Sequence, residues 1–155
     1  MKRTLTAIFA IVLIVSMVAC NNNTADISNA SAIDIAAHVR ESVSFLDDML
    51  EVKNEIAEDF YNLPEGVVDL KVYMSSSGAT AEELAIFKCE SNEVADEVVN
   101  ACEKRVEALK EKFEDYIPAE LTKIESAVIQ KRDCFVMFVC AAETAPAEES
   151  FENYK

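Results

Sequence analysis

The chain has 155 residues, of which 29 are acidic and 14 are basic, and its formal net charge at pH 7 is −15. Nucleic-acid binding needs Lys and Arg side chains that neutralise phosphates, and adhesion to an anionic lipid surface needs a basic patch, so this balance argues strongly against both. The length leaves room for one domain, and only two glycines and three prolines punctuate it, which predicts few elements with short connections.

The N-terminus predicts export. Lys2 and Arg3 precede a largely apolar stretch from Leu5 to Ala19, which is the layout of a secretory signal. The stretch is shorter than the roughly 20 apolar residues that a membrane-spanning helix needs. We therefore predict that residues 1–19 form a signal peptide that is cleaved.

The cleavage region predicts a lipid anchor. Met17-Val18-Ala19-Cys20 resembles the lipobox of bacterial lipoproteins. The resemblance implies diacylglycerol on the sulfur of Cys20 and a protein held on the extracytoplasmic side of the cell membrane, where two acyl chains give stable anchoring. A plain secreted protein is the alternative, but the ordinary signal peptidase prefers a small residue where Met17 stands. Cleavage removes two basic residues and no acidic one, so the mature chain is more negative by two charges.

The mature chain is predicted to begin with a flexible polar linker, residues 20–31, followed by a single domain, residues 32–155. Apolar residues at spacings of three and four predict a first helix from Ile33 to about Met49, with Ser31 as its N-cap. The apolar positions of this helix are Ile35, Val39, Val43, Leu46 and Met49. A second, short helix is predicted over about Lys53–Tyr61.

A β-hairpin follows in the prediction. Its strands are Val68–Met74 and Leu84–Cys89, joined by a loop from Ser75 to about Glu82. The first strand alternates, which predicts one buried and one solvent-exposed face. The buried positions are Leu70, Val72 and Met74, and the exposed positions are Asp69, Lys71 and Tyr73.

The loop is longer than a hairpin needs, which suggests recognition of a partner through Ser75, Ser76 and Ser77, with Tyr73 as an aromatic anchor beside them. The favoured interpretation of Tyr73 is nevertheless packing beneath the N-terminal helices. Turn chemistry also explains the serines better than a nucleophile does, because a nucleophile needs a base within reach, and His38 lies in a separate helix.

The second half of the chain opens with the clearest helix, Asn92–Phe113, with Ser91 as a plausible cap. After Pro118 we predict a short turn of helix and then two strands, Ala127–Lys131 and Cys134–Cys140. The second of these strands is apolar on both faces, which predicts a central place in the sheet.

The acidic tail from Ala141 is predicted to close with a loose helix that docks through Phe151 and Tyr154. The fold class is therefore α+β. We predict a two-layer sandwich in which N-terminal helices are followed by β-β-α-β-β, with an antiparallel four-stranded sheet.

The stretch from Tyr61 to Val139 resembles a family of small Gram-positive lipoproteins catalogued only as a domain of unknown function. The resemblance rests on Tyr61-Asn62-Leu63, on the segment from Val72 to Lys88 (VYMSSSGATAEELAIFK), and on Phe113 to Pro118 (FEDYIP). It implies an extracytoplasmic location and no particular activity.

The cysteines and the single histidine predict no metal centre and no cofactor. Cys89, Cys102, Cys134 and Cys140 remain after Cys20 is lipidated, and we favour buried free thiols, with one disulfide left open. Cys134 and Cys140 are too far apart along one strand to pair with each other. No C-x-x-C motif is present, and His38 is interpreted as a helix-surface residue.

These features favour a non-enzymatic binding module that is held to the membrane by lipid on Cys20 and meets an envelope protein or a cell-wall partner, without binding nucleic acid. One alternative is a cell-wall hydrolase that uses carboxylates, and another is a small-ligand receptor accessory to a transporter. No spacing singles out a catalytic pair of acids. Asp47-Asp48 and Glu82-Glu83 are interpreted as solvated.

Overall fold

The computed structural model describes residues 27–155. The predicted signal peptide, residues 1–19, and the predicted lipidation site, Cys20, lie outside the described residues. The elements run in the order α1 (Ala32–Ser42), β1 (Met49–Val52), α2 (Asn54–Tyr61), β2 (Val67–Ser75), β3 (Glu83–Cys89), α3 (Asn92–Glu114), the 3-10 turn η1 (Pro118–Glu120), α4 (Leu121–Glu125), β4 (Val128–Arg132), β5 (Phe135–Cys140) and α5 (Ala145–Asn153).

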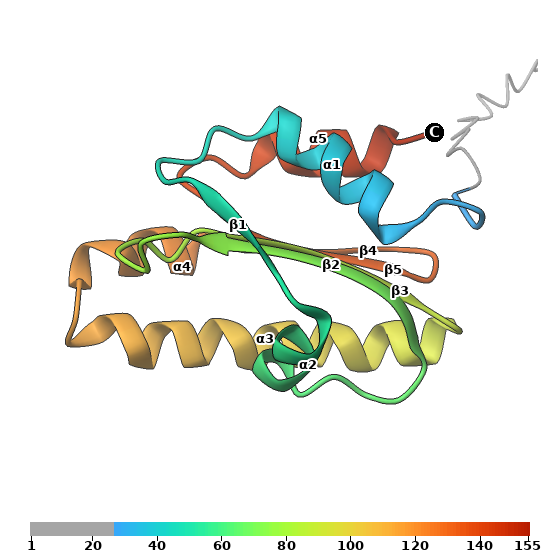
Figure 1. Cartoon of the computed structure of the whole chain (residues 1–155), viewed down its shortest axis with the longest axis horizontal. Helices are drawn as coiled ribbons and strands as arrows, with labels where there is room; N and C mark the ends of the chain where they lie inside the picture. The colour runs from blue at the N-terminus through green and yellow to red at the C-terminus, as the bar shows by residue number, and fades with distance from the viewer. Residues whose placement is uncertain (1–26) are drawn as a thin grey trace, which may run out of the picture.

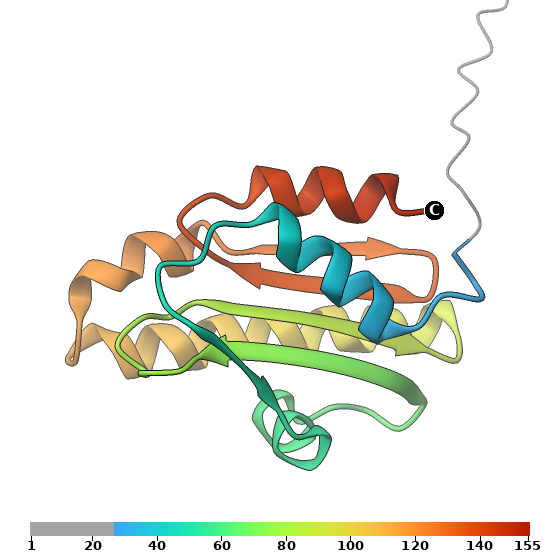
Figure 2. The same ribbon diagram turned by 45° about the horizontal axis from the view of Figure 1, so that its top comes forward.

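The described part of the chain has three layers built on one five-stranded antiparallel sheet. The strand order is β1-β2-β3-β5-β4. The long helix α3 and the short helix α2 cover one face of the sheet, whereas α1 and α5 lie side by side on the other face (Figure 1 and Figure 2). The α+β class and the antiparallel sheet are confirmed. The predicted two layers and four strands are wrong.

Each face of the sheet has its own hydrophobic core. Phe87 and Phe138 belong to the core under α3, and Ile86 belongs with Phe151 of α5 to the core on the opposite face. Successive side chains of a strand point to opposite faces, so β3 and β5 supply both cores. All six residues of β5 are buried, and the strand lies between β3 and β4, which confirms its predicted interior position.

The polar residues of β2 explain why the second helical layer was not predicted. They are partners of the elements that cover their face. The Asp69 carboxylate accepts a hydrogen bond of 2.7 Å from the backbone N–H of Ala32 at the start of α1. Lys71 is buried and forms a 2.5 Å ion pair with Glu51 of β1. An alternating pattern therefore did not mean a solvated face here.

The chain after α1 is extended, although the apolar spacing predicted continued helix. α1 ends at Ser42, and β1 pairs antiparallel with β2 as the fifth strand. The buried Glu82 carboxylate accepts hydrogen bonds from the backbone N–H groups of Leu46, at 2.9 and 3.0 Å, and of Asp47, at 3.1 Å. These bonds hold the connection away from helical geometry and leave the Leu46 side chain 75% exposed.

The other predicted elements are confirmed, with boundaries that differ by one or two residues. α2 ends at Tyr61 and is capped by Asn62, which has a left-handed φ of 47°, and Gly66 supplies the next turn with φ 93°. The Ser91 hydroxyl accepts the N–H of Val94 at 3.3 Å and so caps α3 as predicted.

The packed domain begins earlier than the predicted boundary at residue 32. Ile27 is buried in the core on the α1 and α5 face, and Lys88 donates hydrogen bonds to the carbonyl oxygens of Ser28 and Ala30, at 3.0 and 2.9 Å. At the other end Phe151 docks α5, as expected. Among residues 27–155 no helix is long and apolar enough to cross a membrane.

Candidate functional site

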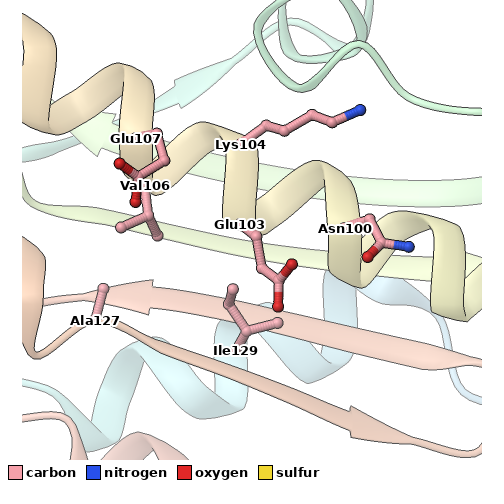
Figure 3. Close-up of a pocket in the computed structure, with 7 residues that line it drawn as sticks. All are labelled: Asn100, Glu103, Lys104, Val106, Glu107, Ala127 and Ile129. Atoms are coloured by element: carbon pink, nitrogen blue, oxygen red, sulfur yellow. The ribbon is translucent and has the colours of Figure 1, made fainter.

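A groove with a volume of about 720 Å³ lies between α3 and the edge strand β4 (Figure 3). Its apolar lining comes from Val106 on the helix and from Ala127 and Ile129 at the strand. Its polar rim comes from α3 and consists of Asn100, Glu103, Lys104 and Glu107.

Regular secondary structure generates this lining. The rim residues are spaced by three, four and seven positions, which places them along one side of a helix. Ala127 and Ile129 are two positions apart and therefore share one face of the sheet. At the N-terminal end of α3, Lys131 donates hydrogen bonds of 2.5 Å to the Asp96 carboxylate and of 3.1 Å to the Asn92 carbonyl, which ties helix and strand together there.

The groove presents the carboxylate of Glu103 beside an apolar floor. Figure 3 shows the Glu103 carboxylate directed toward Ile129, whereas the Lys104 side chain points away from the strand. No hydrogen bond or ion pair within residues 27–155 holds the Glu103 carboxylate. Glu107 is 67% exposed and pairs with Lys110 at 2.8 Å. A ligand that presents a cation to Glu103 therefore displaces no existing partner.

The serine loop is organised around Asp47. The hydroxyls of Ser75 and Ser77 each donate to the Asp47 carboxylate at 2.5 Å, Ser76 donates at 3.2 Å, and the backbone N–H of Ser77 adds a bond of 2.9 Å. These hydrogen bonds, led by that from Ser75, lower the pKa of Asp47 well below its ordinary value. Asp48 is exposed as predicted, whereas Asp47, although still accessible to solvent, is also the acceptor around which the loop is organised.

This arrangement gives the loop a pH dependence. The folded-state pKa of Asp47 lies below the ordinary value of 3.8, so its contribution to stability is complete well above pH 3.8 and is lost as the pH falls below that value. We expect the loss of unfolding free energy in Asp47→Asn to be largest near neutral pH and to shrink between about pH 5 and about pH 2. Urea titrations of both proteins at several pH values measure this difference, with Asp48→Asn as the control for the loss of one neighbouring charge. A difference that stays constant with pH would contradict the expectation.

Tyr73 lies where the favoured interpretation placed it. Its side chain is half-buried against the core on the α1 and α5 face, and the Arg40 guanidinium of α1 lies 4.8 Å from the ring centre. The structure thus brings Ser75, Ser76 and Ser77 together on Asp47 and places Tyr73 under α1. Contact of these four residues with a partner stays a prediction.

Glu82 and Glu83 are buried, so their interpretation as solvated acids is wrong. Their residues are only 1% and 2% exposed. Glu83 accepts a 2.5 Å hydrogen bond from the Tyr61 hydroxyl and forms a 2.8 Å ion pair with Arg105. Besides its backbone bonds, Glu82 lies 3.5 Å from the ammonium of Lys123. Burial, and next the charge of Glu83, raise the pKa of Tyr61 well above its usual range.

A small cavity of about 80 Å³ adjoins this ion-pair cluster, between the serine loop and α3, and Arg105 and Lys112 contribute to its walls. Arg105 is already committed to Glu83. Lys123 also binds Glu120 at 2.8 Å, and although burial opposes it, that bond helps to lower the pKa of Glu120. These charges are paired with one another, which indicates a structural role for the cluster.

The four cysteines of the described region are free thiols. Desolvation is the main cause that raises the pKa of Cys89 to about 11 and that of Cys140 to about 12, and burial also raises the pKa of Cys102. Cys102 lies in the apolar face of α3 as predicted. His38 is exposed on α1, with its ring 5.2 Å from that of Tyr154.

Within residues 27–155 no group of three or more His, Cys, Asp or Glu side chains is placed to hold a metal ion. The groove itself was not predicted from the sequence. The sequence predicted the two elements that form it: Lys104 and Glu107 lie outside the apolar stripe of the predicted helix, and Ile129 lies in a predicted strand. It did not predict that these two elements would lie side by side. Which strand forms the edge of the sheet cannot be obtained from such local patterns.

Fold and groove together define a three-layer α+β domain with a helix-lined groove beside an edge strand. The family described as "Domain of unknown function (DUF4358)" matches residues 41–141, and the chain belongs to this family. The matched region runs from the end of α1 to the end of the sheet and includes the whole groove. No curated protein and no solved structure gives a significant match. The expected resemblance to a domain of unknown function is confirmed, whereas the lipoprotein character stays a prediction.

Proposed function

We propose that this protein is a lipid-anchored, non-enzymatic binding module on the outer face of the cytoplasmic membrane, and that it binds an envelope protein through the groove between α3 and β4. The observation that carries the proposal is the groove itself, in which an apolar floor lies beside the Glu103 carboxylate, which has no partner within residues 27–155. Binding sites commonly combine an apolar surface with a few placed polar groups.

The state of the other reactive groups supports a binding role over the hydrolase alternative. A general acid or base works best when its pKa lies near the operating pH. The pKa of Asp47 is shifted downward, away from neutrality, and its oxygens accept hydrogen bonds from the loop serines. Glu83 is held by Tyr61 and Arg105. These groups stabilise the fold, and their hydrogen bonds are already committed.

The predicted lipid anchoring to the membrane is tested by Cys20→Ala. We expect the mature protein from its native membrane to begin at Cys20 and to carry diacylglycerol, and we expect the variant to be lost from the membrane fraction, because two acyl chains supply the anchoring. Mass spectrometry of the extracted protein and fractionation of the cells measure this. Cys134→Ala is the matched control and should remain membrane-bound. An unlipidated wild-type chain in the medium would overturn the proposed membrane anchoring.

The binding surface is tested by site-specific photo-cross-linking in living cells that produce the full-length protein. A benzophenone side chain at Glu103 should form a covalent adduct with one defined protein, whereas the same group at the exposed Glu58 of α2 should not. Ile129→Glu, which places a carboxylate on the groove floor, should abolish the adduct while circular dichroism stays unchanged. Equal adducts from positions 103 and 58, or no adduct from position 103, would overturn the assignment of the groove.

A further inference from the structure

The strand that borders the groove has an open hydrogen-bonding edge. β4 is the last strand in the sheet order, and among residues 27–155 its only neighbouring strand is β5. Arg132 and Phe135 are paired across a two-residue turn and therefore form a hydrogen-bonded pair. Because bonding alternates along an antiparallel ladder, the backbone N–H and C=O groups of Ile129 and Lys131 point outward, away from β5.

Two of the common protections against pairing with another strand are missing at this edge. Native edges are often blocked by a lysine that projects over them or by a proline. β4 has no proline. Its lysine, Lys131, donates hydrogen bonds to Asp96 and Asn92 on α3 and therefore does not project over the edge. The Ile129 side chain faces the groove, so the open backbone edge and the apolar floor lie on the same strand.

Charge determines which kind of strand fits. On the rim, Glu107 is paired with Lys110 and the Lys104 side chain points away from β4, whereas the Glu103 carboxylate is directed toward Ile129 and has no partner among the described residues. A segment with Lys or Arg side chains is complementary to this rim. A second copy of the chain is not, because each copy brings the same Glu103 carboxylate and a net charge of −15.

We propose that the groove binds an extended, basic polypeptide segment, which adds antiparallel to β4 as a sixth strand. This inference rests on the proposed function, since it names the ligand class of the same groove. The rim from Asn100 to Glu107 spans about 10 Å of helix, which corresponds to about three residues of a strand. In antiparallel pairing, the peptide residues opposite Ile129 and Lys131 direct their backbone groups to β4 and their side chains to the α3 face. The peptide residue opposite Ile129 lies nearest the Glu103 carboxylate and therefore carries the cation, whereas the residue opposite Lys131 is uncharged, because like charges directly opposite one another on neighbouring strands are destabilising.

The test uses the full-length mature protein in detergent micelles and a synthetic peptide, TKTVTKT, acetylated and amidated at its ends. One derivative is N-methylated at the lysines and the valine, and a second at the inner threonines. The first modification removes the donors that face β4, whereas the second modifies only the far edge. We expect binding to be lost for the first derivative and retained for the second. Equal affinity of the two derivatives would overturn strand addition.

Amide hydrogen exchange gives an independent reading of the same geometry. The peptide should slow exchange of the Ile129 and Lys131 amides at least tenfold, while Val128 and Gln130 are already protected by β5. Glu103→Gln should weaken peptide binding by about threefold, as for loss of one exposed ion pair, and Glu58→Gln should leave it unchanged. Replacing the peptide lysines by glutamates should abolish binding, and binding that survives this change would overturn the charge assignment.

Failure of this inference can be told apart from failure of the proposed function. If position 103 cross-links to a protein in cells but no exchange protection appears at Ile129 and Lys131, the groove binds by side chains alone, and strand addition is overturned. If position 103 gives no adduct, the proposed function itself fails. Sedimentation of the peptide-free protein tests whether the edge strand pairs with a second copy of the chain. A dimer in which both amides are protected would make that second copy the occupant and would overturn the proposal.

Discussion

Replacement of Arg105 by Met should lower the free energy of unfolding by about 3–5 kcal/mol, as expected when one partner of a buried ion pair is removed. The Glu83 carboxylate is almost fully buried and forms a 2.8 Å ion pair with the guanidinium, whose side chain is itself mostly buried. Burial alone would lower the pKa of Arg105, but the charge of Glu83 and its hydrogen bond raise it above the ordinary value and so favour the charged guanidinium. Without Arg105, Glu83 keeps only the Tyr61 hydroxyl as a side-chain partner.

Urea unfolding at pH 7, followed by circular dichroism, measures this loss. Lys110→Met is the matched control, because its ion pair with Glu107 is exposed, and exposed pairs contribute only about 0–1 kcal/mol. In the double variant Glu83→Gln with Arg105→Met, neither position of this pair leaves an unpaired charge buried, so part of the stability should return. An Arg105→Met protein within about 1 kcal/mol of the wild type would show that the pair is solvated in solution.

Alkylation of Cys140 by iodoacetamide at pH 8 should be about 1,000-fold slower in the folded protein than in urea, and that of Cys89 about 100-fold slower, because the thiolate is the reactive species. The pKa of the Cys140 thiol rises from 9.0 to about 12 and that of Cys89 from 9.0 to about 11, mainly through desolvation. Burial also blocks access of the reagent, which slows the reaction of both thiols further. Raising the pH from 8 to 9 increases the thiolate fraction about tenfold for both thiols.

Peptide-resolved mass spectrometry of a labelling time course measures each thiol separately. Cys134 is only half-buried and serves as the internal comparison. We expect it to be labelled before Cys89, Cys102 and Cys140 in the folded protein, and we expect all four to be labelled at similar rates in urea. Labelling of Cys140 in the folded protein within about tenfold of its rate in urea would contradict a buried, protonated thiol.

Local periodicity was enough to predict most of the elements. The apolar stripe of α3, the hairpin of β2 and β3 and the apolar strand β5 were found because each pattern is set by its own secondary structure. The same approach failed after Ser42, where apolar spacing suited a helix but the carboxylate of Glu82 binds the backbone of Leu46 and Asp47 instead. A side chain more than thirty residues away decides the conformation there.

The candidate site could likewise be predicted only in part, because it depends on contacts between residues far apart in the sequence. The predicted serine loop exists, but its central acceptor, Asp47, comes from the connection before β1. The groove depends on β4 being the edge of the sheet, which is a property of strand order. Burial of Glu82 and Glu83 likewise depends on cations from two other helices, Lys123 and Arg105. Long-range pairings of this kind leave no periodic trace in the sequence.

Both ends of the described chain emerge from the same side of the sheet. Ile27 packs in the core beneath α1, and α5, the last helix, lies beside α1 (Figure 1). The groove lies on the opposite side, under α3. A fluorescent protein or purification tag fused after Lys155 would therefore lie on the α1 and α5 face of the sheet, away from the groove. The C-terminus is thus the attachment point at which a reporter can follow the protein in cells without covering its proposed binding surface.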